Sequence, residues 1–136
     1  MDEDPTLFGQ GRYPDTGPLA VLARLAFVVA VVAIAVAVYL PPQLVPQILR
    51  SMYLEHFAAY YVALLVGLAA MPRSKLRRVV TGFAIFATVL ESSHLLAGAR
   101  PGPLIRNWVA DLGGLAAAAA PVVVERFRRR LRKPPG

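Results

Sequence analysis

The chain contains four apolar segments of membrane-spanning length, and this pattern restricts its fold more than any other feature. A helix needs about 20 apolar residues to cross a hydrocarbon core of about 30 Å. The segments cover residues 19–40, 54–71, 76–97 and 104–124. Only one of the twelve prolines, Pro121, lies inside a segment, and proline ends or kinks helices. The sequence therefore predicts an all-α membrane protein with four transmembrane helices in a compact bundle. A soluble helical bundle is the alternative.

The composition agrees with a membrane protein. Hydrophobic residues make up 57% of the 136 residues, whereas soluble domains average about 45–50%. The chain also has a net charge of +7, which in a soluble protein would suggest nucleic-acid binding. Here most of the charges lie outside the apolar segments, so we expect no nucleic-acid partner. The absence of cysteine excludes thiol catalysis and thiolate zinc sites.

The basic residues predict the orientation, because Lys and Arg are enriched in cytoplasmic loops. With the N-terminus inside, twelve of the fifteen basic residues lie on the inner side, and three lie outside: Arg50, Arg100 and Arg106. We therefore expect a multi-pass bacterial inner-membrane protein with both termini in the cytoplasm. Residues 1–18 would form a disordered or surface tail, residues 19–124 the membrane domain, and residues 125–136 a basic tail attracted to anionic lipid.

Polar residues interrupt three of the four segments at one depth. Each pair lies roughly 5–10 Å below the predicted outer surface, at about 1.5 Å per residue. Helical spacing of three or four residues places the members of each pair on one face. The pairs are His56 with Tyr60, Glu91 with His94, and Asn107 with Asp111. Ionisable groups in membrane segments usually face the bundle interior or a water-filled cavity.

These faces predict an outward-facing polar pocket covered by Arg100 and Arg106. Arginine suits a phosphate or carboxylate group, because the guanidinium fork matches both. The alternative is a purely structural interhelical hydrogen-bond cluster below an ordinary charged loop. Glu55 is interpreted as a solvated charge in the first turn of its helix. The first segment, almost entirely Val and Ala, is interpreted as scaffold.

The same residues suggest two kinds of chemistry. Carboxylates beside imidazoles are used in general acid–base catalysis, which makes Glu91, His94 and Asp111 the catalytic candidates. A metal ion could accept the two imidazoles and two carboxylates of His56, Glu91, His94 and Asp111. No spacing in the chain matches a local metal motif such as H-E-x-x-H, so the sequence by itself predicts no metal and no cofactor.

Three short elements resemble the VanZ-like family of small bacterial membrane proteins. Residues 56–60 (HFAAY) match its H-F-x-x-Y element, and residues 91–94 (ESSH) match E-x-x-Q with His94 in place of Gln. Residues 107–114 (NWVADLGG), after the loop that ends at Arg100, match D-x-x-x-N-x-x-G with Asp and Asn exchanged. Tyr53 replaces the family's usual Lys. The resemblance covers residues 20–124 and implies a cell-envelope setting and a link to glycopeptide (teicoplanin) resistance, but no reaction.

The sequence therefore leads to three functional hypotheses. The first is binding of an anionic cell-envelope lipid or glycan precursor in the polar pocket. The second is a membrane enzyme that uses acid–base or metal-assisted chemistry on a lipid-linked substrate. The third is a small accessory subunit of a larger membrane complex. In each, membrane lipids surround the helices.

Overall fold

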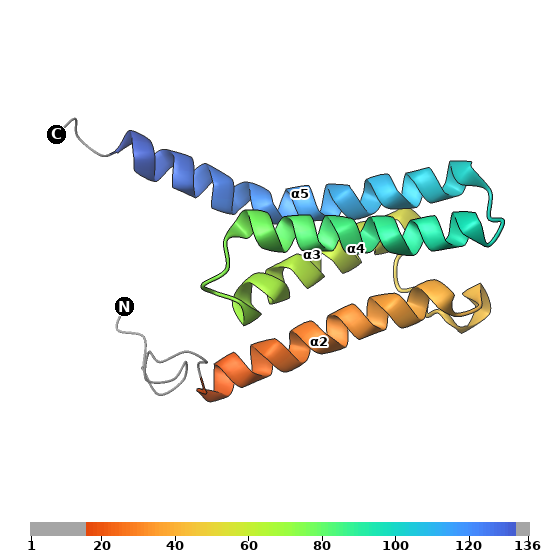
Figure 1. Ribbon diagram of the computed structural model, residues 1–136, viewed down its shortest axis with the longest axis horizontal. Helices are drawn as coiled ribbons and strands as arrows, with labels where there is room; N and C mark the ends of the chain where they lie inside the picture. Colours follow the sequence, from red (N-terminus) through yellow and green to blue (C-terminus); the bar gives the residue numbers. More distant parts are fainter. Residues whose placement is uncertain (1–15, 133–136) are drawn as a thin grey trace.

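The computed structural model describes residues 16–132, and the regular secondary structure of this part is entirely helical. Four long helices, labelled as in Figure 1, are joined by short connections, with a 3₁₀ helix after the first. Their bounds are α2 Pro18–Tyr39, η1 Pro42–Leu44, α3 Met52–Ala70, α4 Leu76–Leu96 and α5 Pro101–Leu131. Residues 1–15, most of the predicted N-terminal tail, and residues 133–136 lie outside the described part.

All four long helices have the length and composition to cross a membrane. The predicted all-α fold with four transmembrane helices is thus confirmed. Prolines mark the helix boundaries, as expected: Pro18 and Pro101 occupy the first turns of α2 and α5, where the missing N–H has no intrahelical partner to lose. Pro72 follows the end of α3.

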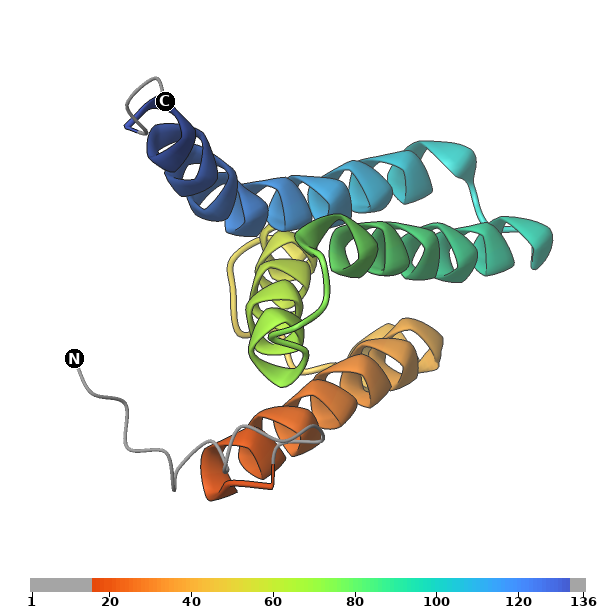
Figure 2. The ribbon, with the colours of Figure 1, turned by 60° about the vertical axis from the view of Figure 1, so that its left-hand side comes forward.

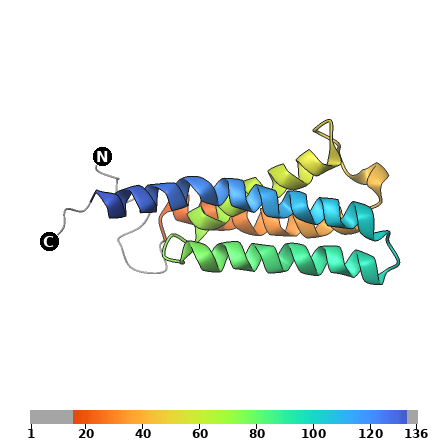
Figure 3. The same cartoon turned by 90° about the horizontal axis from the view of Figure 1, so that it is seen from above.

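The fourth helix differs from the prediction, because α5 runs from Pro101 to Leu131 instead of covering residues 104–124. At about 1.5 Å per residue, its 31 residues span about 46 Å, and its C-terminal part extends beyond the other helices (Figure 3). The basic segment is helical because residues 122–131 contain no Pro or Gly. An ion pair of 2.8 Å between Glu125 Oε1 and Arg129 Nε supports the added turns.

Helix α3 lies between α2 and α5 (Figure 2), and α4 packs against both α5 and α3. The core lies mainly among α3, α4 and α5. Its buried residues are Tyr60, Ala63, Leu64, Val79, Phe83, Ala87, Leu115 and Ala118. No residue between Pro18 and Tyr39 is buried, so α2 covers one side of α3 without entering the core.

Gly114 allows the close approach of α3 and α5. A Cβ at Gly114 would collide with the backbone carbonyl of Phe57 and lie 3.1 Å from the backbone nitrogen of Tyr61. Without a hydrophobic driving force between helices in lipid, such close packing is a major source of helix association. The contact fixes α5 directly beside the first half of α3.

Candidate functional site

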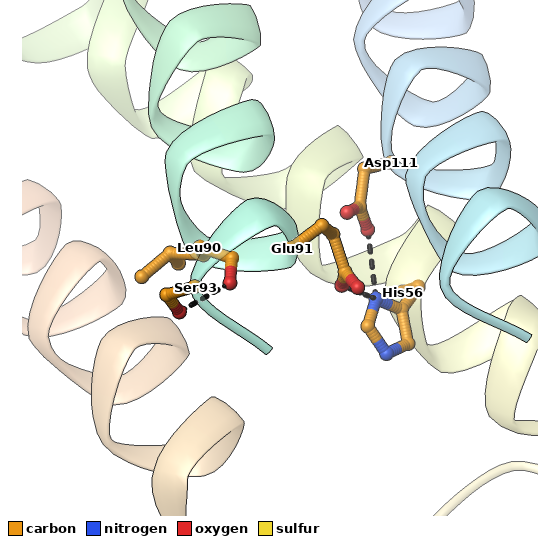
Figure 4. Close-up of polar contacts among 5 residues, drawn as sticks. All are labelled: His56, Leu90, Glu91, Ser93 and Asp111. Carbon is orange, nitrogen blue, oxygen red and sulfur yellow. Dashed lines mark hydrogen bonds and ion pairs between the residues drawn. The ribbon is translucent and has the colours of Figure 1, made fainter. Parts of the chain in front are cut away.

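The site is built where α3, α4 and α5 meet, and each helix contributes one ionisable side chain (Figure 4). His56 Nδ1 lies 2.8 Å from Asp111 Oδ1 and 3.9 Å from Glu91 Oε1. The shorter contact is a hydrogen bond, in which an imidazole N–H donates to the carboxylate. The structure therefore brings together one member of each predicted polar pair.

The helix packing explains this convergence. His56 precedes Phe57, whose carbonyl contacts Gly114, and Asp111 lies about one turn before Gly114 on α5. The glycine contact therefore places Asp111 opposite His56. Glu91 lies about one turn before the end of α4 at Leu96, and the short connection to Pro101 brings it to the same level as the first turns of α5.

Both carboxylates are buried, since Glu91 is 7% exposed and Asp111 is 1% exposed. Three buried oxygens among the described residues accept no hydrogen bond: Glu91 Oε2, Asn107 Oδ1 and Asp111 Oδ2. Leaving a buried acceptor unpaired costs about 1–3 kcal/mol, and more for a charged group. Buried polar groups normally have partners, so these oxygens indicate a site for donors or a cation.

The residues that carry these oxygens line a cavity of about 470 Å³, a size within the range of about 300–1,000 Å³ typical of ligand pockets. Its polar lining comes from α3, α4 and α5, with Gln47 from the α2–α3 connection. Its apolar wall is made mainly by α2. That wall comprises Ala33, Ile34, Ala37, Val38 and Leu40. Helix α2, interpreted from the sequence as scaffold, thus forms part of the pocket.

The other predicted pocket residues divide into two groups. Tyr60, His94 and Asn107 line the cavity. Tyr60 is also part of the core, packed edge-on to Phe83. By contrast, Arg100 and Arg106 are exposed, and neither lines the cavity. The structure thus leaves the two arginines outside the lining that they were expected to cover.

His94 takes a different position from the other candidate metal ligands. Its ring stacks on Tyr39 of α2, with centroids 5.7 Å apart. Ligand atoms from His56, Glu91 and Asp111 lie within 4.8 Å of one another, and His94 is not part of that group. The predicted set of four donors is therefore reduced to three in this arrangement.

Three residues near the site were not recognised as participants from the sequence. Glu55 accepts backbone hydrogen bonds from Ile48 (2.6 Å) and Leu49 (2.9 Å), so it fixes the α2–α3 connection over the cavity instead of being only solvated. Ser93 Oγ donates to the Leu90 carbonyl (Figure 4). The Tyr39 hydroxyl, 2.9 Å away, must then donate to Ser93. The available sequence signal for Tyr39 was its position at the end of an apolar segment, directly before Leu40 and two prolines.

Comparison of the chain with protein families, curated proteins and solved structures finds no match. The fold and site nevertheless define a class. The protein is a multi-pass α-helical membrane protein with a cavity between α2 and the other three helices.

Proposed function

We propose that the protein binds an anionic cell-envelope lipid or lipid-linked glycan precursor in a bacterial inner membrane. The observation that carries this proposal is the cavity itself, in which an apolar wall faces residues that carry three buried oxygens without hydrogen-bond donors. An amphiphilic ligand complements both surfaces, because its chain would lie along α2 while its polar group supplies the donors.

The polar floor favours a head group rich in hydroxyl groups. The unpaired oxygens of Glu91, Asn107 and Asp111 are acceptors, and sugar hydroxyls are donors that acceptors of this kind bind. Hydrogen bonds to charged groups contribute about 1.5–3 kcal/mol each. A glycan would therefore satisfy the floor better than a simple acyl lipid.

The charge of the site constrains where an anionic group would lie. Glu91 and Asp111 make the floor acidic, so a phosphate or carboxylate would be repelled from it. Arg100 and Arg106 are exposed at the end of the bundle that carries the cavity, and guanidinium groups bind both kinds of anion. The anionic group is accordingly assigned outside the cavity lining, beside these arginines, and the glycan to the floor.

The resemblance to the VanZ-like family belongs to the same proposal. The three short elements that carry it supply His56, Glu91 and Asp111, and these residues converge in the fold. Convergence of residues from separate matching elements supports membership, with its cell-envelope setting and its link to glycopeptide resistance. Expression in a susceptible host should then raise the inhibitory concentration of teicoplanin, and unchanged susceptibility would argue against that link.

A catalytic role on a lipid-linked substrate is a second candidate, favoured by one contact. The 2.8 Å hydrogen bond from His56 to Asp111 is a carboxylate–imidazole pair bordering the cavity, with Glu91 beside it. Such a pair can hold and move a proton. This arrangement moves the expected acid–base group from His94 to His56. Turnover of a lipid-linked sugar that is lost in His56→Gln would favour this candidate.

The binding proposal is tested by filling the cavity from α2. Ala37→Phe places a ring in the cavity, whereas Val32→Phe makes a similar change on a face of α2 that does not line it. Native mass spectrometry of gently extracted protein should detect a retained lipid in the wild type and in Val32→Phe, and about tenfold less in Ala37→Phe. Titration with a polyprenyl diphosphate-linked disaccharide and with phosphatidylglycerol then identifies the head group.

Equal retention by both variants, with both folded, would show that the retained lipid lies outside the cavity. Preference for phosphatidylglycerol over the disaccharide-bearing lipid would contradict the role of the floor as a glycan site.

A further inference from the structure

The cluster of His56, Glu91 and Asp111 has more negative charge and more hydrogen-bond acceptors than its single imidazole can satisfy. Two carboxylates face one imidazole, so at least one negative charge is uncompensated in the cluster when both carboxylates are ionised. The carboxylates are more than nine-tenths buried. An uncompensated buried charge is strongly unfavourable, and such charges are normally paired or bound to metals.

The imidazole satisfies only part of the cluster. His56 Nδ1 is within hydrogen-bond distance of Asp111 Oδ1. The distance of 3.9 Å from Nδ1 to Glu91 Oε1 is too long for a hydrogen bond. Each carboxylate also has a second oxygen, Glu91 Oε2 and Asp111 Oδ2, that is buried without a partner. Both carboxylates point toward the imidazole (Figure 4), so one bound cation would contact all three side chains.

We propose that His56, Glu91 and Asp111 bind a divalent transition-metal ion, Zn²⁺ or Mn²⁺. Their donor atoms lie within 4.8 Å of one another, which brackets the spacing around an ion with bonds of about 2.0–2.2 Å. One imidazole and two carboxylates suit these ions, while soft metals prefer the sulfur ligands that this site lacks.

Binding would replace the hydrogen bond between His56 and Asp111 with coordination. The imidazole nitrogen that donates to Asp111 Oδ1 must release its proton before its lone pair can bind the ion. The ion would carry two positive charges into a cluster with two negative charges. Three protein ligands also leave a coordination position open, as in catalytic zinc sites, and this position would face the cavity.

The site was not visible as a sequence motif because its ligands come from three helices. His56 and Glu91 are separated by 35 residues, and Glu91 and Asp111 by 20, whereas motifs such as H-E-x-x-H place ligands on one helix. This inference goes beyond the proposed lipid binding and does not depend on it. An ion bound here would occupy the oxygens of Glu91 and Asp111, so a head group would then meet the ion instead of these two acceptors.

The test uses the full chain in detergent, stripped with a chelator and titrated with ZnCl₂ or MnCl₂ alone. Elemental analysis after desalting should give about one ion per chain for the wild type and for the control Glu125→Gln, an exposed carboxylate also on α5. Asp111→Asn and Glu91→Gln should each weaken binding by about tenfold or more, because even changes outside the ligand set cost about 10–100-fold.

A second measurement on unmodified protein covers the case in which a variant fails to fold. Zn²⁺ or Mn²⁺ should raise the thermal midpoint of the stripped wild type, and bound Co²⁺ should give visible d–d absorption whose intensity reports its coordination number. No midpoint shift together with equal metal content in all four proteins would overturn the proposal. Lipid retention by the chelator-stripped protein is measured separately, so failure of either proposal is distinguishable from failure of the other.

Discussion

Asp111 is the most completely buried ionisable side chain in the described part of the chain, at 1% exposure. Removing one partner from a buried ion pair generally costs about 3–5 kcal/mol, because it leaves the other charge uncompensated. The 2.8 Å contact with His56 therefore has a structural consequence whatever binds in the cavity. For this reason the tests of the site compare ligand or metal binding with folded yield.

Among the glycines in the described part of the chain, Gly114 is the position where an added side chain would be tolerated least. Gly114→Ala would drive a Cβ into the Phe57 carbonyl, and backbone cannot rotate away as a side-chain end can. We expect α3 and α5 to separate at a cost of about 1–3 kcal/mol, the usual range for overpacking. Thermal unfolding in detergent, followed by circular dichroism, measures this loss.

Gly82→Ala is the matched control, because it also lies inside a helix but has open space where the added methyl group would lie. It should be neutral or stabilising, since alanine favours a helix by about 1 kcal/mol over glycine. Equal thermal midpoints for the two variants would mean that the α3–α5 contact does not limit stability.

Helical geometry explains which of the predicted pocket residues face the cluster of His56, Glu91 and Asp111 and which do not. At about 100° per residue, Arg106 lies roughly 140° around the axis from Asp111, so both cannot face the same cavity. His94 is about 60° from the direction of Glu91, and it faces Tyr39 of α2 instead of His56. The depth of these residues was predictable, but their rotation toward particular neighbours depended on helix packing.

At the scale of elements, α2 is the least firmly held helix of the bundle. It packs mainly on α3, and it meets α4 through the edge-on contact of Phe27 with Phe83 and, at its C-terminal end, through Tyr39. That residue contributes a hydrogen bond to Ser93 and a ring stacked on His94. Since α2 forms the apolar wall of the cavity, this contact controls how closely the wall is held to the polar floor.

Removing the contact should therefore open the cavity. Tyr39→Ala loses a hydrogen bond and a stacked ring, each contributing about 0.5–1.5 kcal/mol. We expect a cysteine introduced at Ala59, an exposed lining residue, to react with a soluble maleimide about three- to tenfold faster. The measurement is direct because the native chain has no cysteine.

Tyr39→Phe separates the two contributions, because it removes the hydroxyl and keeps the ring. It should have a smaller effect than Tyr39→Ala. An unchanged reaction rate in Tyr39→Ala would mean that the other contacts of α2 hold it in place, namely its packing on α3 and the edge-on contact of Phe27 with Phe83 of α4.

The α4–α5 pair has its own polar connection. Trp108 Nε1 donates to Thr88 Oγ1 at 2.9 Å, and Thr88 Oγ1 donates to the Ala84 carbonyl at 2.7 Å. Both residues are in apolar segments where sequence alone gave them no role. Thr88 donates to its own helix and accepts a hydrogen bond from a residue of the neighbouring helix. Only the tertiary structure determines which helix is that neighbour.

At the scale of the whole molecule, four membrane spans place the start of α2 and the end of α5 on the same side of the membrane. In the ribbon these two helix ends also lie at the same end of the bundle (Figure 1). The α3–α4 connection is at that end and carries Arg73 and Lys75. The α4–α5 connection, with Arg100, lies at the other end beside the cavity. The basic bias therefore predicts that the cavity end faces away from the cytoplasm.

Cysteine labelling of intact cells tests this orientation. A membrane-impermeant maleimide should modify Gly102→Cys, at a position with open space around it, and should leave Lys75→Cys unmodified until the membrane is permeabilised. The reverse pattern would place the cavity at the cytoplasmic side and exclude an outer-leaflet ligand.

The sequence alone determined the four spans, their approximate ends and the common depth of the polar residues. These properties follow from local physics: the apolar length needed to cross lipid, the effect of proline on helices, and the rise per residue. Tertiary structure decided that His56, Glu91 and Asp111 meet while His94 and the arginines do not. It also made α2 a wall of the cavity. Such choices depend on helix rotation and partner, which are set by close contacts such as Gly114 against Phe57 and by no local pattern.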